Sequence, residues 1–106
     1  MVTKLNYSKE RKQEVLLPVL LCFMPVDAHQ HLMVNNLMEQ LQPKITGRIQ
    51  VLKIEEIVHP GVAQSFSVNQ LPCFVLVWQG IELWRQVGFP TGNLLELLED
   101  CLAKTN

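Results

Sequence analysis

The sequence has few cysteines, no excess of charge of either sign and no long apolar stretch. Its 106 residues include three cysteines, all far apart, which excludes the disulfide framework of a small secreted domain. Nine basic and ten acidic side chains give a net charge of −1, so the chain lacks the basic field that holds phosphates. We therefore expect no nucleic-acid partner. Five glycines and six prolines are too few for a collagen-like or low-complexity chain.

The longest apolar run, Val15–Val26, is too short to cross a bilayer, which needs about 20 residues. It could serve as the apolar core of a signal peptide, with cleavage near Ala28. Against cleavage, Glu10 and Glu14 lie in the segment that should be basic, and Pro18 interrupts the run. We interpret the run as a buried central strand, and we expect no membrane partner and a cytoplasmic location.

The residues that are present are typical of one packed domain. Apolar residues make up 48% of the chain and charged residues 18%. A chain of this length buries roughly 60–70% of its unfolded surface, which is enough for a core. No repeat, low-complexity segment or internal boundary divides the sequence. We therefore predict a single domain over residues 1–106.

Apolar runs and helix signals alternate along the chain. The first run shows no polar alternation, which is typical of a strand covered on both faces. The order α-β-α-β-α-β-β-α predicts an α/β fold: a central mixed sheet with a parallel part and a C-terminal antiparallel hairpin, flanked by helices. The expected strands are Val19–Met24, Ile49–Ile54, Phe74–Trp78 and Glu82–Val87, with a turn at Gln79-Gly80. The expected helices begin at Ser8, Asp27, Pro60 and Thr91, the first ending before Pro18, the second at Pro43 and the third near Phe66.

Two of these helices carry an apolar face at helical spacing. In the helix after Asp27, polar residues such as Asn35 are expected to face outward. The tryptophans at 78 and 84 are expected to pack on the sheet, because no basic groove accompanies them. The expected inner faces are Leu32, Met33, Leu37, Met38 and Leu41 in one helix and Leu94, Leu95, Leu98, Cys101 and Leu102 in the other.

Four segments of the second half follow one another in a fixed order: His59–Pro72, Phe74–Trp78, Gln79-Gly80 and Gln86-Val87-Gly88. In order and spacing they resemble the thioredoxin family, and the resemblance runs from about Leu16 to Leu102. It implies a thioredoxin-like fold in which Pro72, preceded by Leu71, is the family's cis-proline. It also implies a groove beside this proline that binds extended polypeptide through backbone hydrogen bonds.

The redox motif of that family is degenerate in this chain. Counted without gaps, Cys22-Phe23 takes the place of the family's Asp-Phe, and Asp27 that of its tryptophan. The four residues Ala28, His29, Gln30 and His31 stand in the place of Cys-Gly-Pro-Cys. Lys53 matches the lysine that partners the family's buried aspartate, so half of a proton-relay pair is expected to remain. We predict no catalytic residue here, since alanine carries no nucleophile and histidine cannot resolve a disulfide.

Three functions are compatible with these residues. The first is a redox-inactive protein- or peptide-binding or chaperone-like module without cofactors, in which Asp27, His31, Leu71, Pro72 and Cys73 bind the substrate. The alternative is an atypical thiol–disulfide oxidoreductase or redox-homeostasis protein that uses the lone Cys73. It requires Cys73 to be partly exposed beside Pro72, whereas free cysteines are more often packed in a core or loop, which is the interpretation we favour. The third is a self-associating structural subunit, and the oligomeric state stays open. We favour the binding module because thiol exchange has a strict requirement for a nucleophile.

A metal site is a further alternative, with His29, His31 and Cys73 as ligands, because imidazole and thiolate suit zinc or copper. Histidines two residues apart at a helix start do not share one face, so we expect no metal. Cys22 and Cys101 are expected to be small core side chains. The acidic pair Glu55-Glu56 is expected to face solvent.

Overall fold

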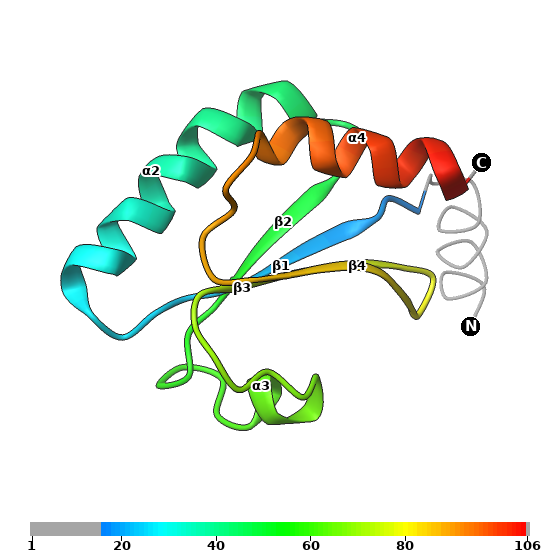
Figure 1. Cartoon of the computed structure of the whole chain (residues 1–106). Coiled ribbons are helices and arrows are strands. Elements are labelled where there is room, and N and C mark those ends of the chain that lie inside the picture. The colour runs from blue at the N-terminus through cyan, green and yellow to red at the C-terminus, as the bar shows by residue number, and fades with distance from the viewer. Residues whose placement is uncertain (1–15, 106) are drawn as a thin grey trace, which may run out of the picture.

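The computed structural model describes residues 16–105. Its elements follow in the order β1 (Val19–Phe23), α2 (Ala28–Ile45), β2 (Gln50–Ile54), α3 (Val62–Ser65), β3 (Cys73–Trp78), β4 (Ile81–Val87) and α4 (Leu94–Thr105) (Figure 1). The strands form one four-stranded sheet in the order β2-β1-β3-β4. Strand β1 is parallel to β2 and antiparallel to β3, and β4 is antiparallel to β3. The predicted mixed sheet is confirmed; the predicted helix at Ser8 falls on residues outside the described part.

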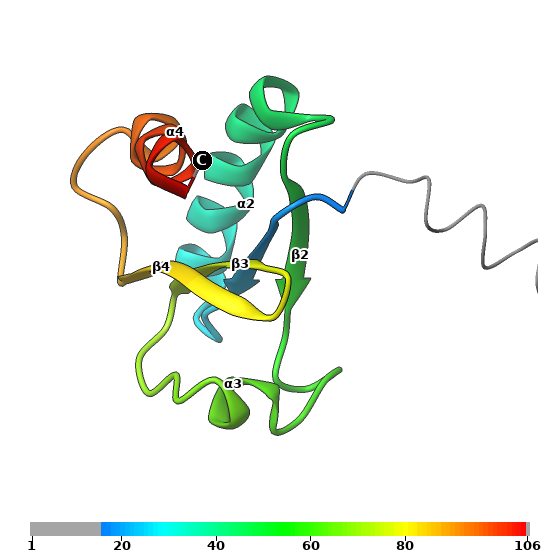
Figure 2. The same cartoon turned by 90° about the vertical axis from the view of Figure 1, so that its right-hand side faces the viewer.

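Helices α2 and α4 cover one face of the sheet, and the short α3 lies on the other (Figures 1 and 2). The pleat of β1 sends alternate side chains to the two faces. Leu20 and Cys22 belong to the core under α2 and α4, while Leu21 and Phe23 belong to the core under α3. Both sides of β1 are therefore buried, as its continuous apolar sequence predicts.

The inner face of α2 differs from the prediction. Its buried residues are Val34, Met38, Leu41 and Ile45, while Leu32 and Met33 are exposed. The sheet selects this stripe, because only this part of the helix lies over the core strands. Pro43 also does not end α2, which continues to Ile45. The last turn closes because the Thr46 N–H and hydroxyl both donate to the Gln42 carbonyl, at 3.0 and 2.7 Å.

The other two helices begin later than predicted. Pro60 lies before the first residue of α3, and Gly61 takes the N-cap position with a φ of 86°, which glycine adopts without strain. Asn93 replaces Thr91 as the cap of α4, because its side-chain oxygen accepts the Glu96 N–H at 3.1 Å. Among residues 16–105, no helix combines the length and apolar character needed to cross a membrane.

The hairpin between β3 and β4 has the predicted turn. Gln79 and Gly80 both have positive φ, 53° and 80°, which suits the twist of a two-residue hairpin. The register shifts between Leu76 and Val77, because Leu76 faces Trp84 and Val77 faces Glu82. Residue 83 is therefore the extra residue of a β-bulge. Trp84 packs against the core under α2 and α4, as expected, and the Trp78 ring N–H donates to the Leu16 carbonyl at 3.0 Å.

Candidate functional site

One end of the sheet gathers four loops. Phe23 faces Ile54 in β2 and Cys73 in β3, and Cys73 faces Val87 in β4. The segments 24–27, 55–61, 66–72 and 88–93 therefore leave or enter the sheet at the same end, together with the start of α2 (Figure 1). We call this region the cis-proline end.

The Leu71–Pro72 peptide bond at this end is cis. Pro72 is buried, and its carbonyl accepts the Gly88 N–H at 2.8 Å, which ties the loop to β4. The half-buried Leu71 side chain lines a small cleft together with Phe23 and Ala63. Within residues 16–105, the Leu71 N–H and C=O have no hydrogen-bond partner. The backbone just before the cis-proline is thus open to pairing with another chain.

The start of α2 holds no sulfur. Asp27 caps the helix as predicted, because its carboxylate accepts the Gln30 N–H at 2.9 Å. Ala28, the first helical residue, carries no reactive group, and His29 is exposed. A helix N-terminus lowers the pKa of a thiol placed there, but no thiol uses this effect here.

His31 belongs to a polar network that links α2 to the end of β2. Lys53 Nζ donates to Asn35 Oδ1 at 2.6 Å, so the Asn35 amide nitrogen is turned to His31 Nδ1, 3.3 Å away. In this arrangement His31 Nδ1 accepts from the amide, and His31 Nε2 lies 3.4 Å from Glu55 Oε1. Asn35 and Glu55 were expected to face solvent; both are half-buried instead, because strand β2 runs alongside the first turns of α2.

Burial suppresses the reactivity of the first two cysteines. Cys22 is fully buried, and burial raises the pKa of its thiol to about 12 despite the opposing charge of Lys53. Cys73 is also fully buried, and burial raises its pKa although Arg85 acts in the opposite direction. Cys73 thus packs in the core, as favoured from the sequence, and lacks the partial exposure that the oxidoreductase alternative needs, because the pleat of β3 directs its side chain into the core under α3.

Lys53, the half of the proton-relay pair that was expected to remain, lies opposite Cys22. Its ammonium, however, donates to Asn35. A thiol with a pKa of about 12 stays protonated at neutral pH. Cys101 is half-buried, donates to the Leu83 carbonyl at 3.5 Å and has a pKa raised by burial.

The alternative metal site also fails on geometry. In the part of the chain that the structure describes, no three or more His, Cys, Asp or Glu side chains are placed to hold an ion. His29 is exposed at the start of α2, while Cys73 is buried under α3. The three ligands that the sequence suggested therefore do not converge.

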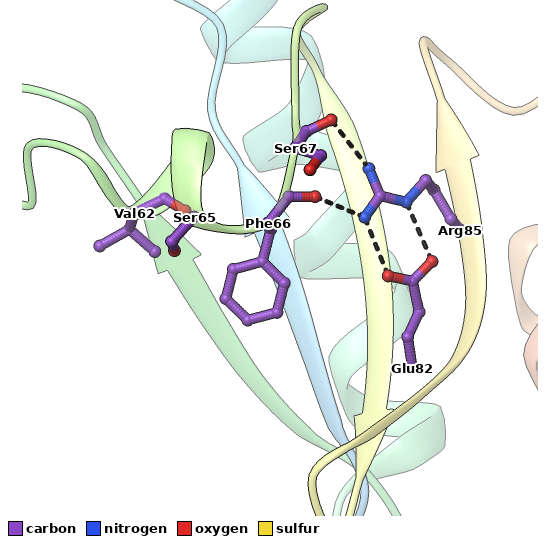
Figure 3. Close-up of polar contacts among 6 residues, drawn as sticks. All are labelled: Val62, Ser65, Phe66, Ser67, Glu82 and Arg85. Atoms are coloured by element: carbon purple, nitrogen blue, oxygen red, sulfur yellow. Dashed lines mark hydrogen bonds and ion pairs between the residues drawn. The ribbon is translucent and has the colours of Figure 1, made fainter.

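Arg85 on β4 holds the segment that leads from α3 to the cis-proline (Figure 3). Its guanidinium donates to the Phe66 carbonyl at 2.7 Å and to the Ser67 carbonyl at 3.4 Å. Glu82 accepts from the same guanidinium at 3.0 and 2.8 Å, and this hydrogen bond lowers the pKa of the Glu82 carboxyl. Ser67 has a φ of 57°, in the left-handed region, so its segment turns sharply at the point where Arg85 binds it.

Sequence reasoning missed this clamp, which we define as Arg85, Glu82 and the carbonyls of Phe66 and Ser67. Residues three apart on a regular strand point to opposite faces. The bulge at Leu83 shifts the pleat, so Glu82 faces Val77 and Arg85 faces Val75, both on the α3 side. A bulge depends on the partner strand, and no local signal in the sequence indicates it.

Four large apolar side chains lie exposed at the cis-proline end. Val26 is 86% exposed, Ile57 is 91% exposed, Val58 is 63% exposed and Val87 is 47% exposed. They come from three different segments, which the strand register brings to the same end. Single exposed apolar residues are ordinary, but several at the same end of the sheet as an open backbone segment suit an interaction surface.

Comparisons with known proteins agree with this geometry in fold. No protein-family model and no curated protein matches the sequence. Among solved structures, thioredoxin-2, described as a component of malaria parasite protein secretion machinery, has 28% identity and a TM-score of 0.71, covering 83% of this chain and 86% of its own. A structure described only as a malarial protein has 25% identity and a TM-score of 0.68 and covers 83% of this chain and 96% of its own.

A third solved structure is the germline-specific thioredoxin Deadhead of Drosophila melanogaster. It has 20% identity and a TM-score of 0.68 over 95% of this chain and 92% of its own. These neighbours and the strand order show that the chain has a thioredoxin-like fold. The fold that the resemblance implied is therefore confirmed.

Proposed function

We propose that this chain is a protein- or peptide-binding module, chaperone-like in kind, that uses a thioredoxin-like fold without dithiol chemistry. One observation carries the proposal: the Leu71 backbone is unpaired within residues 16–105 and lies at the same end of the sheet as the exposed apolar side chains. An extended segment laid there would form main-chain hydrogen bonds and cover apolar surface, as in strand addition to a sheet. The description of one neighbour as part of a secretion machinery is compatible with a role in protein handling.

The chemistry of the same region does not favour the alternative of a thiol–disulfide oxidoreductase. Exchange needs an accessible thiolate to attack and a second thiol to resolve the mixed disulfide. Ala28 and His31 supply neither, and Cys73 is buried with a raised pKa. Of the expected substrate-binding residues, Cys73 is buried and paired with β1 and β4, so we assign the contact to Leu71 and Pro72, with Asp27 and His31 at the start of α2.

We extend the proposal to the setting in which the module works. We propose a cytoplasmic location and a protein partner, with neither nucleic acid nor membrane. The three free cysteines suit a reducing compartment, and a net charge of −1 gives polyphosphates no attraction.

The test is a titration with short, extended, valine-rich peptides, followed by NMR of backbone amides. We expect the largest shifts at Leu71 and its neighbours. Ile57→Ser should weaken binding by about tenfold or more, since one aliphatic side chain is worth about 1.5–3 kcal/mol when fully covered. Ile81→Ser is the matched control, because Ile81 is 64% exposed at the hairpin, away from the cis-proline end.

Two outcomes would contradict the proposal. One is that no peptide binds, or that Ile57→Ser and Ile81→Ser behave alike. The other is catalytic reduction of insulin disulfides by the wild-type chain, lost in Cys73→Ser, which would establish the oxidoreductase instead.

A further inference from the structure

The exposed apolar side chains at the cis-proline end are accompanied by charge of one sign. Its four loops contain three carboxylates, Asp27, Glu55 and Glu56, and neither lysine nor arginine. Asp27 precedes α2 next to Val26, and the two glutamates precede Ile57 directly. The acidic groups therefore border the same side chains that the proposed partner would cover.

Basic residues near this end are turned to other partners. Lys53 donates to Asn35 at 2.6 Å, and Arg85 is held between Glu82 and the carbonyls of Phe66 and Ser67. Neither is paired with a carboxylate of the four loops. No lysine or arginine of the described residues therefore forms a direct ion pair with these three carboxylates.

Each of the three carboxylates is oriented by the protein but keeps capacity to accept. Asp27 accepts the Gln30 N–H, Glu56 accepts the Gly61 N–H at 3.0 Å, and Glu55 lies 3.4 Å from the His31 ring nitrogen. These contacts use one oxygen of each group, and a carboxylate offers roughly four acceptor positions. The groups are held in place by neutral donors, so their charge stays available to a partner.

We infer that the partner segment is both apolar and basic: an extended peptide whose aliphatic side chains cover Val26 and Ile57 and whose lysine or arginine side chains face the carboxylates. This rests on the proposed function and adds the chemical class of the ligand. Opposite charge across the contact speeds encounter and fixes orientation. Like charge excludes acidic segments, which gives selectivity that apolar contact alone cannot provide.

A second copy of this chain is a poorer occupant of the same surface. In a two-fold dimer each residue group meets itself or a neighbour in the same patch. The carboxylates of one copy would then face those of the other without a lysine or arginine in the loops to balance them. The charges thus favour a separate basic segment over self-association.

The experiment compares three short blocked peptides with the same alternating valines and with lysine, serine or glutamate between them. Titration calorimetry is run at low ionic strength and at a pH above the ordinary range of histidine. We expect the lysine peptide to bind about two- to fivefold tighter than the serine peptide for each carboxylate engaged, and the glutamate peptide to bind weakest. Added salt should bring the three affinities together.

Matched variants test whether the preference for the lysine peptide arises from the carboxylates of the cis-proline end. Glu55→Gln and Glu56→Gln should reduce the preference for lysine, while Asp100→Asn, which removes the same charge from the exposed face of α4, should leave it unchanged. Equal affinity for the three peptides would overturn the charge preference and leave the proposed binding function standing. Failure of all three to bind would overturn both. Self-association of the chain that competes with the lysine peptide would replace the basic segment with a second copy.

Discussion

The two faces of the sheet are stabilised in different ways. Under α2 and α4, two long helices bury a continuous apolar core. Under α3, a helix of four residues covers five buried residues. The clamp of Arg85 and Glu82 adds hydrogen bonds to this smaller apolar core. The cis-proline loop enters the sheet from this second face. The segment next to the proposed site therefore depends on polar contacts more than on the burial of apolar side chains.

The largest expected effect concerns the face under α2 and α4. Phe74→Ala removes a fully buried ring from this core and should lower the free energy of unfolding by about 3–5 kcal/mol. Val62→Ala on α3, where the side chain is only partly buried, should cost roughly 1 kcal/mol. Urea unfolding followed by tryptophan fluorescence measures both. Equal losses would contradict the difference between the two faces.

The clamp should give the next largest effect. Arg85→Met removes the donors to the Phe66 and Ser67 carbonyls and should cost about 1.5–3 kcal/mol, the range for hydrogen bonds to charged groups. Arg48→Met is the control, because it breaks an exposed ion pair with Glu99 at 3.1 Å and should cost about 0–1 kcal/mol. Hydrogen exchange should quicken at the hydrogen-bonded amides of residues 66–68 in the first variant only. Unchanged exchange there would refute the role of the clamp.

The clamp also predicts how the free energy of unfolding changes at acid pH. Its hydrogen bond lowers the pKa of Glu82 in the folded chain, so its contribution is present above the ordinary carboxyl range and is lost as the pH falls through the lowered folded value. Glu82→Gln should therefore flatten the loss of unfolding free energy on the acid side. Glu96→Gln, at an exposed carboxyl of α4, should not. A slope that Glu82→Gln leaves unaltered would contradict the assignment.

A smaller effect is expected on the alkaline side. Burial keeps Cys22 neutral in the folded chain up to a pKa of about 12, against an ordinary value of 9.0. A folded pKa above the unfolded one means that stability is complete below about pH 9 and declines as the pH rises toward 12. Cys22→Ala should make this decline shallower in urea unfolding. In the native state, Cys22 and Cys73 should react with a thiol dye far more slowly than after unfolding; fast reaction at Cys73 would reopen the oxidoreductase hypothesis.

The smallest change in stability is expected at the cis-proline end itself. Ile57→Ser and Val26→Ser alter side chains that pack on nothing, so the free energy of unfolding should change by less than about 0.5 kcal/mol. Peptide affinity should fall in the same variants. A loss of affinity without a loss of stability would separate the interaction surface from the core.

Local patterns in the sequence determined most of the fold. Strand-length apolar runs, the Asp27 cap and the Gln79-Gly80 turn act over a few residues, and each produces the element expected from it. The order of these elements, together with the family resemblance, was enough to predict the mixed sheet. The absence of sulfur at the start of α2 is likewise a property of the sequence alone.

Contacts between distant segments determined the features that local patterns did not predict. The bulge that unites Glu82 with Arg85, the network from Lys53 to Glu55, the burial of Cys73 and the exposure of Leu32 all depend on which strand or helix lies alongside. A side chain's neighbours across a sheet are set by register, and register is fixed only when every strand is paired and both faces are packed. The periodicity of one segment does not indicate which strand it pairs with, so the polar contacts of the site could be identified only from the tertiary structure.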